Sequence, residues 1–326
     1  MKQDTATPQA PMLLHLRANL PIVISFACII LLLLLGSLYS ENFLSPDYLI
    51  QQLKVASFLG VIATGMMLII LMGQIDLSVP WLLTTGAMMA SAATAFGPAG
   101  EFLAVPFGVF CGFAMGMVSG VGVAYLRIPA MIVTLAMNVI AQGLMVAYTG
   151  GFSPSDTASS GMRYLATGNL IGGVPNAILV WIGIGALAVF VLNRTTFGRA
   201  VYAIGNRESA AFLSGAATQR LMMFGFGISG ALAAFGGVLL AGYAGKAAQS
   251  MGDAYLLPSI AAVVLGGTSI LGGRGNYLGT VAGVILVTLL QSILSVMQIA
   301  EFGRQIIYGL VIVTMLLLYG RERALR

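Results

Sequence analysis

The sequence predicts an all-α polytopic membrane protein with about ten transmembrane helices and with both termini in the cytoplasm. Hydrophobic residues make up 59% of the 326 residues, and the mean hydropathy is +0.97. Only 8% of the residues are charged, whereas soluble domains carry roughly a quarter. This composition excludes a soluble globular protein. The net charge of +5 falls mostly in the predicted loops, so it reports membrane topology and not nucleic-acid binding.

The hydrophobic residues fall into ten runs that alternate with polar or glycine-rich connections. The first run lacks a small-residue cleavage site before Glu41, which favours a retained span over a signal peptide. We expect one transmembrane domain over residues 20–320, between cytoplasmic tails at residues 1–19 and 321–326. The expected spans cover residues 21–38, 57–72, 77–96, 103–126, 129–148, 175–192, 221–243, 255–270, 277–297 and 305–319.

The basic residues test this orientation, because positive charge near the ends of spans is retained in the cytoplasm. With ten spans and both termini inside, the outer side holds four basic residues and the inner side holds eleven. The outer four are Lys54, Arg163, Lys246 and Arg304. The inner eleven are Lys2, Arg17, Arg127, Arg194, Arg199, Arg207, Arg220, Arg274, Arg321, Arg323 and Arg326.

The longest polar connection inside the expected domain, residues 194–220, contains four arginines and a glutamate. Asn206 follows a glycine and can cap a helix that has Glu208 in its first turn. The small residues Ala210 and Ala211 come next, and Gly215 is a typical helix terminator. The pattern predicts a short cytoplasmic helix, either one that another protein binds or an ordinary solvated loop.

Two spans carry polar residues. Placing Asp76 at the centre of a bilayer would cost about 3 kcal/mol, so we expect it at a span boundary or facing the bundle interior. Thr134, Asn138 and Gln142 are spaced four residues apart and share one helical face. Such a stack either bonds a neighbouring helix or lines a wet path, and the spacing leaves both alternatives open.

Glycine patterns mark two further places. Gly112, Gly116 and Gly120 form a smooth stripe on one helix, which lets a neighbouring helix approach closely. Between the eighth and ninth spans, flexible backbone forms either a hinge beside a path or a tight turn. The glycines of this connection are Gly266, Gly267, Gly272, Gly273 and Gly275.

Several site classes are excluded or disfavoured. Cys28 and Cys111 lie in separate apolar runs, so neither a disulfide framework nor a metal site is expected. The residues 225–230 fit a dinucleotide-binding pattern by letters, but they lie inside a span with no preceding soluble strand. No phosphate-binding loop motif occurs, and the one histidine, His15, lies in the N-terminal tail. We therefore expect no catalytic residue.

Several segments, including residues 128–135 and 148–151, resemble the permeases of ribose-type ABC importers. The polar connection from Arg194 to Asn206, with Ala210, Ala211 and Gly215, resembles the coupling-helix loop of that family. Residues 73–80 are similar to the family's Gly-Gly-Ile-Asp-Leu-Ser-Val-Gly, with departures at Gln74 and Pro80. Residues 264–283 resemble its most recognisable signature, and the resemblance covers nearly the whole chain after about Asn42.

The resemblance implies a type II ABC importer-like fold and a permease subunit in a bacterial inner membrane. The expected substrate is a monosaccharide, such as a ribose-like pentose or a hexose, or a related polyol. The implied partners are a cytoplasmic ABC ATPase, a periplasmic sugar-binding protein and a second permease copy, identical or different. ATP and Mg would be bound by the ATPase, and no cofactor is expected in this chain.

The resemblance also suggests roles for residues. The residues expected to couple to the ATPase are Arg199, Gly205, Asn206, Glu208, Ala210, Ala211 and Gly215. A neutral sugar needs hydroxyl and amide partners, so the expected translocation path comprises Asp76, Ser78, Thr134, Asn138 and Gln142. Two alternatives remain: a branched-chain amino acid-type ABC permease, and a proton-coupled secondary sugar carrier, for which Asp76 is the only candidate acid.

Overall fold

A computed structural model describes residues 11–39, 41–152 and 156–324, and within these ranges the chain is almost entirely helical. A two-stranded antiparallel hairpin, β1 (Asn169–Ile171) with β2 (Val174–Pro175), is the only sheet among the described residues. The helices are α1 Pro11–Tyr39, α2 Pro46–Leu71, α3 Val79–Ala93, α4 Gly97–Ala124, α5 Ala130–Thr149, α6 Ser160–Thr167, α7 Asn176–Arg194, α8 Thr196–Leu213, α9 Thr218–Ala244, α10 Leu256–Leu265, α11 Tyr277–Val296 and α12 Glu301–Ala324.

Six helical stretches of the described chain are long and apolar enough to cross a membrane. One of them, Val79–Ala124, has 46 residues and contains both α3 and α4. The backbone reverses between these two helices at Gly97, whose φ of +71° is left-handed, and the helices then pack against each other. Shorter apolar helices cover Val23–Leu38, Asp253–Leu265 and Phe302–Thr314. The chain is therefore a multi-pass membrane protein, and the total of ten spans remains a prediction.

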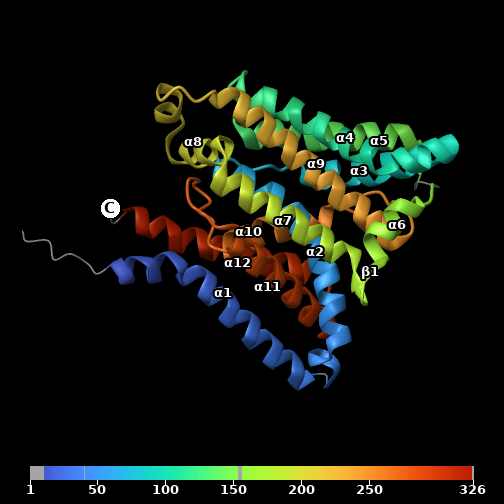
Figure 1. Ribbon diagram of the computed structural model, residues 1–326, viewed down its shortest axis with the longest axis horizontal. Coiled ribbons are helices and arrows are strands. Elements are labelled where there is room, and N and C mark those ends of the chain that lie inside the picture. The colour runs from blue at the N-terminus through green and yellow to red at the C-terminus, as the bar shows by residue number, and fades with distance from the viewer. Residues whose placement is uncertain (1–10, 40, 153–155, 325–326) are drawn as a thin grey trace, which may run out of the picture.

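The helices form two groups joined by α2, and α7 packs against α2 (Figure 1). One group contains α3, α4, α5 and α9, and the other contains α1, α10, α11 and α12. Helix α8 lies at one end of the molecule, and α6 with the hairpin lies at the opposite end. This arrangement places the two polar connections of the chain, around α8 and α6, on opposite sides of the apolar bundle.

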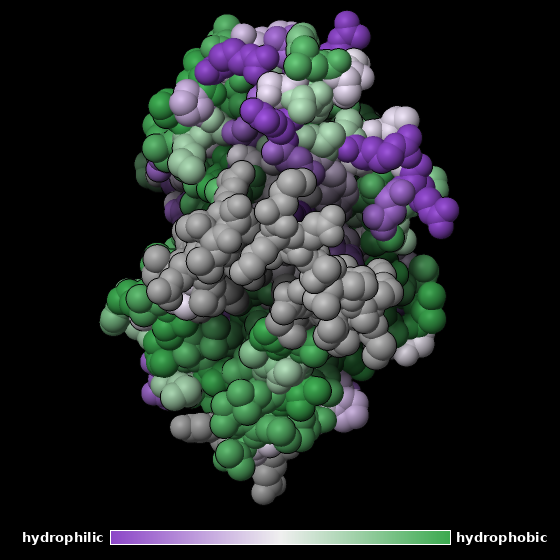
Figure 2. All heavy atoms as spheres, turned by 90° about the vertical axis from the view of Figure 1, so that its left-hand side faces the viewer, coloured by the Kyte–Doolittle hydropathy of each residue, from purple (hydrophilic) through white to green (hydrophobic). Residues whose placement is uncertain are grey.

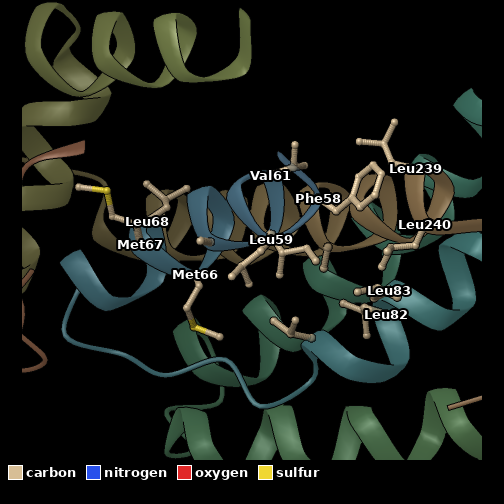
Figure 3. Packing of buried hydrophobic residues seen from close by; sticks show 14 of the residues in the cluster. Phe58, Leu59, Val61, Met66, Met67, Leu68, Leu82, Leu83, Leu239 and Leu240 are labelled. Carbon is tan, nitrogen blue, oxygen red and sulfur yellow. The ribbon is translucent and has the colours of Figure 1, made fainter. Parts of the chain in front are cut away.

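Helix α2 is the centre of the bundle. Every residue from Ala56 to Leu71 is buried, as expected for a helix that is apolar on all faces and surrounded by protein. Figure 3 shows Phe58 and Leu59 of α2 with Leu82 of α3 and Leu239 of α9, which belong to the same buried cluster. Contacts with α9, α11, α10 and α7 cover the remaining sides of α2.

The predicted glycine stripe packs α4 directly against α9. A Cβ atom added to Gly112 would lie 2.3 Å from Cβ of Ala234 and 2.4 Å from the carbonyl oxygen of Gly230. One added to Gly116 would lie 2.3 Å from the carbonyl oxygen of Phe226. Such distances are too short for real atoms, so the absence of side chains on α4 is what lets the two helix backbones touch.

Several element boundaries differ from the sequence prediction. Helix α1 begins at Pro11, so residues 11–19 are helical, and the expected tail at residues 1–10 lies outside the described residues. Helix α2 begins at Pro46, earlier than expected, because the Ser45 hydroxyl caps it by accepting from the Tyr48 N–H. The connection between the expected spans 129–148 and 175–192 contains α6 and the hairpin.

The close contact of α4 with α9 predicts a position-specific cost for one added methyl group. Gly112→Ala should destabilise the protein by about 1–3 kcal/mol, because overpacking forces the helices apart. Gly143→Ala is the matched control, since Gly143 also lies within a helix but has no atom within 4 Å of an added Cβ. Thermal unfolding in detergent, followed by fluorescence, measures both. Equal melting temperatures for the two variants would contradict this packing.

Candidate functional site

The chain between α2 and α3 is extended and runs into the interior of the bundle. Helix α2 ends at Leu71, and Gly73 takes a left-handed φ of +74° before the irregular stretch 74–77. Helix α3 then starts at Val79 with Pro80 in its first turn, where proline is tolerated. The first N–H groups of a helix have no partner within it, and buried ones need a partner from elsewhere.

Asp76 supplies a hydrogen-bond acceptor for the residues at the start of α3. The side chain is buried, and its Oδ1 accepts from the Ser78 N–H at 3.0 Å and from the Ser78 hydroxyl at 2.5 Å. Its Oδ2 accepts from the hydroxyl of Ser229 in α9 at 2.9 Å. The carboxyl group therefore lies at the N-terminus of α3, where a negative charge is favourable, and faces the bundle interior as predicted.

Helix α5 supplies the other partners. The Thr134 hydroxyl accepts from the Leu77 N–H at 3.0 Å, and Asn138 Oδ1 accepts from the Trp81 N–H at 3.3 Å. Two residues of the predicted polar face thus bond a neighbouring helix start, which is one of the two alternatives that the spacing left open. We call Asp76, Ser78, Thr134, Asn138 and Ser229 the α3-start cluster.

Gln142 and Ser229 are the two exceptions to the sequence prediction. Gln142 is exposed on α5 and does not join the α3-start cluster. Ser229 does join it, although it was not predicted. A single serine in the small-residue run of residues 225–230 carries no distinctive signal, because serine is common where helices pack closely in membranes.

Helix α8 consists of two helices joined at a kink at Arg207, where the backbone is extended. The second helix begins close to Asn206 and has Glu208 in its first turn, as predicted. The first helix is capped by Thr195, whose hydroxyl accepts from the Gly198 N–H at 3.2 Å. The prediction that Asn206 caps a helix is wrong, because its Nδ2 donates to the Tyr202 carbonyl within the preceding turn, at 3.0 Å. The break divides α8 into residues 196–206 and 208–213.

The end of α8 matches the prediction for Gly215. This residue has a left-handed φ of +88°. Its N–H bonds the Phe212 carbonyl at 2.9 Å, and the Ala216 N–H bonds the Ala211 carbonyl at 3.1 Å. This is the hydrogen-bond pattern of a glycine-terminated helix.

Two side chains near the end of α8 were missed by the sequence interpretation. Phe212 is 59% exposed and Leu213 is 84% exposed, although both are large and apolar. Ala210 is also exposed, whereas Ala211 is buried against the bundle. Exposed large apolar residues on an element outside the apolar bundle indicate a surface that another protein can cover.

Three separate glycine-containing segments meet beneath the first half of α8. A Cβ on Gly205 would lie 1.8 Å from the Leu71 carbonyl oxygen and 2.4 Å from the Gly273 nitrogen, and one on Gly272 would lie 2.7 Å from the Gly73 nitrogen. The Gly273 N–H also donates to the Leu71 carbonyl at 2.9 Å. We call Gly73, Gly205, Gly272 and Gly273 the glycine junction.

The segment between α10 and α11 forms a turn, which is the second of its two predicted alternatives. Gly267, Gly272 and Gly273 have positive φ values of +87°, +85° and +72°. The Tyr202 hydroxyl of α8 donates to the Gly275 carbonyl at 3.0 Å. Burial raises the pKa of Tyr202 above its ordinary value, so the phenol remains a hydrogen-bond donor at physiological pH.

Gly266 has a packing role at the end of α10. A Cβ atom on this residue would lie 2.3 Å from the Gly279 carbonyl oxygen of α11. The glycine therefore lets the two helix ends touch.

The end of the molecule that carries α8 has a hydrophilic part and a hydrophobic part. It faces the viewer in Figure 2, where hydrophilic residues gather over its upper part and hydrophobic residues fill the lower part. A cleft of about 520 Å³ separates the first half of α8 from residues 214–217 and includes Arg199 and Gly215 in its lining. Arg199 is charged and exposed, and the cleft beside it is lined mainly by apolar residues such as Phe197 and Leu221.

One ion pair crosses this surface. The Arg127 guanidinium, in the turn between α4 and α5, donates to Oε1 of Glu208 in the second half of α8. The side chains are 54% and 34% exposed, respectively. Among the described residues, no group of three or more His, Cys, Asp or Glu side chains could hold a metal ion.

The comparisons with known proteins agree on one family. A family described as "Branched-chain amino acid transport system / permease component" matches residues 48–318. The chain is 34% identical to the ribose import permease protein RbsC of Haemophilus influenzae, over 90% of this chain and 91% of that protein. It is 32% identical to RbsC of Bacillus subtilis, with 92% of each covered.

A relative with a different named cargo is equally similar. The autoinducer 2 import system permease protein LsrC of Yersinia pestis is 32% identical, over 91% of this chain and 84% of that protein. No solved structure matches the chain.

The α3-start cluster predicts that Asp76 is needed for stability. Asp76→Ala would leave three buried donors without an acceptor, at about 1–3 kcal/mol for each unsatisfied group. We expect a lower melting temperature than for Ser229→Ala, which removes only one of these bonds. Gln142→Ala, on the exposed face of α5, should leave the melting temperature unchanged. Full stability of Asp76→Ala would show that the cluster is not required for the fold.

Proposed function

Because the chain belongs to the branched-chain amino acid/ribose-type ABC permease family, we propose that it imports a monosaccharide or a related polyol. As a member of that family it is a transport subunit of an ABC importer, without a catalytic domain. The energy for transport is supplied by ATP hydrolysis in a partner subunit. In this proposal ATP and Mg are bound by the partner, and this chain holds no cofactor.

The observation that carries the sugar class is the identity to ribose import permeases over nine-tenths of the chain. The stretch 73–80, which fits the sugar-transporting branch, supports the same class and forms the junction of α2 with α3. The named cargo of the LsrC relative leaves the individual compound open. A pentose, a hexose or a related polyol satisfies the proposal.

The two alternatives are less well supported. A branched-chain amino acid permease would share the fold, but the relatives compared above import ribose or autoinducer 2 by name. A proton-coupled carrier needs an acid that exchanges protons during transport. Asp76 is held by three hydrogen-bond donors, an arrangement suited to a fixed structural carboxylate.

The proposed assembly has three proteins around this chain. A cytoplasmic ABC ATPase binds α8, a periplasmic sugar-binding protein binds the opposite end, and a second permease copy completes the pathway within the lipid bilayer of a bacterial inner membrane. In this topology ten helices cross the bilayer, namely α1 to α5, α7 and α9 to α12. Helix α8 is then the coupling helix, and its exposed Phe212 and Leu213 fit a hydrophobic groove on the ATPase.

Uptake into proteoliposomes tests the transport class. Vesicles containing the permease, its ATPase and its binding protein should accumulate labelled ribose, another pentose, a hexose or a polyol only with ATP inside the ATPase-facing compartment. Omitting the ATPase should abolish uptake, and an uncoupler should leave it unchanged. Uptake that persists without the ATPase and stops with an uncoupler would instead establish a secondary carrier. A panel that contains branched-chain amino acids distinguishes the other alternative.

The docking surface on α8 predicts a specific loss. Leu213→Asp should lower recovery of the ATPase with the tagged permease by at least roughly tenfold, because a desolvated apolar anchor is replaced by a charge. The matched control is Leu170→Asp, which changes a leucine that is also exposed, at 67%, but lies on the hairpin at the opposite end. Normal recovery with Leu213→Asp would place the ATPase contact elsewhere.

A further inference from the structure

Arg127 has an unusual backbone for its residue type. It follows the end of α4 with a φ of +58°, in the left-handed region where glycine is the default and other residues are uncommon. The Ile128 N–H bonds the Gly122 carbonyl at 3.3 Å, so the turn folds back on the last part of α4. An arginine in this position bears a backbone cost that a glycine would avoid, which indicates that its side chain is needed.

The side chain of Arg127 has one ionic partner, Glu208. Ion pairs with this degree of exposure contribute little to stability, because water competes for both charges. The pair therefore does not explain why the chain keeps a left-handed arginine. What the pair does is join the second half of α8 to the turn that leads into α5.

From this turn the connection continues to the start of α3. Helix α5 begins at Ala130, and Thr134 in its second turn bonds the Leu77 N–H. Asn138, one turn further along, bonds the Trp81 N–H. A displacement of the α4–α5 turn therefore acts on the first residues of α3 through side chains that cap them.

The first half of α8 contacts a different part of the bundle. Gly205 touches the last carbonyl of α2 and the backbone at Gly273, before the break at Arg207. The first half of α8 thus contacts the end of α2 and the segment between α10 and α11, whereas Glu208 in the second half contacts the turn between α4 and α5. A movement of α8 about Arg207 changes the position of one of these contacts relative to the other.

We propose that Arg127 and Glu208 are positioning residues for coupling, through which the second half of α8 moves α5 and the start of α3. This inference rests on the proposed function, because it assigns the ATP-driven movement of α8 a route into the membrane. It concerns a contact within this chain and is separate from the binding of the ATPase to Phe212 and Leu213.

The test uses the reconstituted transporter and the number of sugar molecules imported for each ATP hydrolysed. Arg127→Gly removes the side chain and also relieves the left-handed backbone, so its melting temperature should equal or exceed that of the unaltered protein. Its ATPase recovery should be unchanged, but the sugar imported per ATP should fall by at least roughly fivefold, as expected for loss of coupling between two sites.

The matched control is Gln298→Gly. Gln298 is an exposed residue with a φ of +57° in the turn between α11 and α12. The substitution therefore relieves the same left-handed backbone conformation but leaves the Arg127–Glu208 ion pair intact. Its sugar-to-ATP ratio should equal that of the unaltered protein. A fall equal to that of Arg127→Gly would show that any glycine in such a turn uncouples transport, and would overturn the proposal.

A double-mutant cycle separates the pair from a general effect of the turn. In the background of Glu208→Gln, Arg127→Gly should have no further effect on the sugar-to-ATP ratio, because the contact is already lost. The same fall in both backgrounds would overturn the proposal, as would an unchanged ratio for Arg127→Gly alone. Failure of the proposed function would show differently, as an absence of ATP-dependent sugar uptake by the unaltered protein.

Discussion

The start of α3 inside the bundle imposes the main constraint on this structure. Asp76 meets Ser229, which lies about 16 Å along α9 from its first residue at 1.5 Å per residue. Backbone N–H groups at such depth cannot rely on bulk water and need protein partners. Asp76 in the α2–α3 connection and Thr134 and Asn138 of α5 accept from these N–H groups, and Ser229 of α9 donates to the Asp76 carboxyl group. These bonds fix how α3, α5 and α9 sit against one another.

The features that could be predicted from the sequence are those set by local composition. Hydropathy located the apolar helices, and glycines spaced four apart located the contact of α4 with α9. The i, i+4 spacing placed Thr134 and Asn138 on one face, but whether that face meets protein or a path depends on the neighbouring helix. The role of Ser229 and the contact of Arg127 with Glu208 depend on tertiary structure, so no local pattern could predict them.

The glycine motifs illustrate the same limit. Gly73, Gly205 and Gly272 belong to three stretches that are far apart along the chain, and each could be noticed individually. Only the folded chain brings their backbones into contact beneath α8. Packing without side chains is close and stiff, because nothing flexible separates the backbones. The first half of α8 is therefore held by backbone contacts, whereas its second half contacts the bundle through the buried Ala211 and an exposed ion pair.

The hydrogen bonds within the protein also limit which side chains of the proposed path can bind a sugar. A hydroxyl group of the substrate binds best to a polar group with unused capacity. Asp76 and Ser78 bond each other, and Thr134 both accepts from Leu77 and donates to Ala130. Asn138 uses its oxygen for Trp81 but retains its amide N–H groups, and Gln142 is exposed on the same helix. Substrate contact along α5 should therefore involve Asn138 and Gln142, while the carboxylate and hydroxyls hold the start of α3 in place.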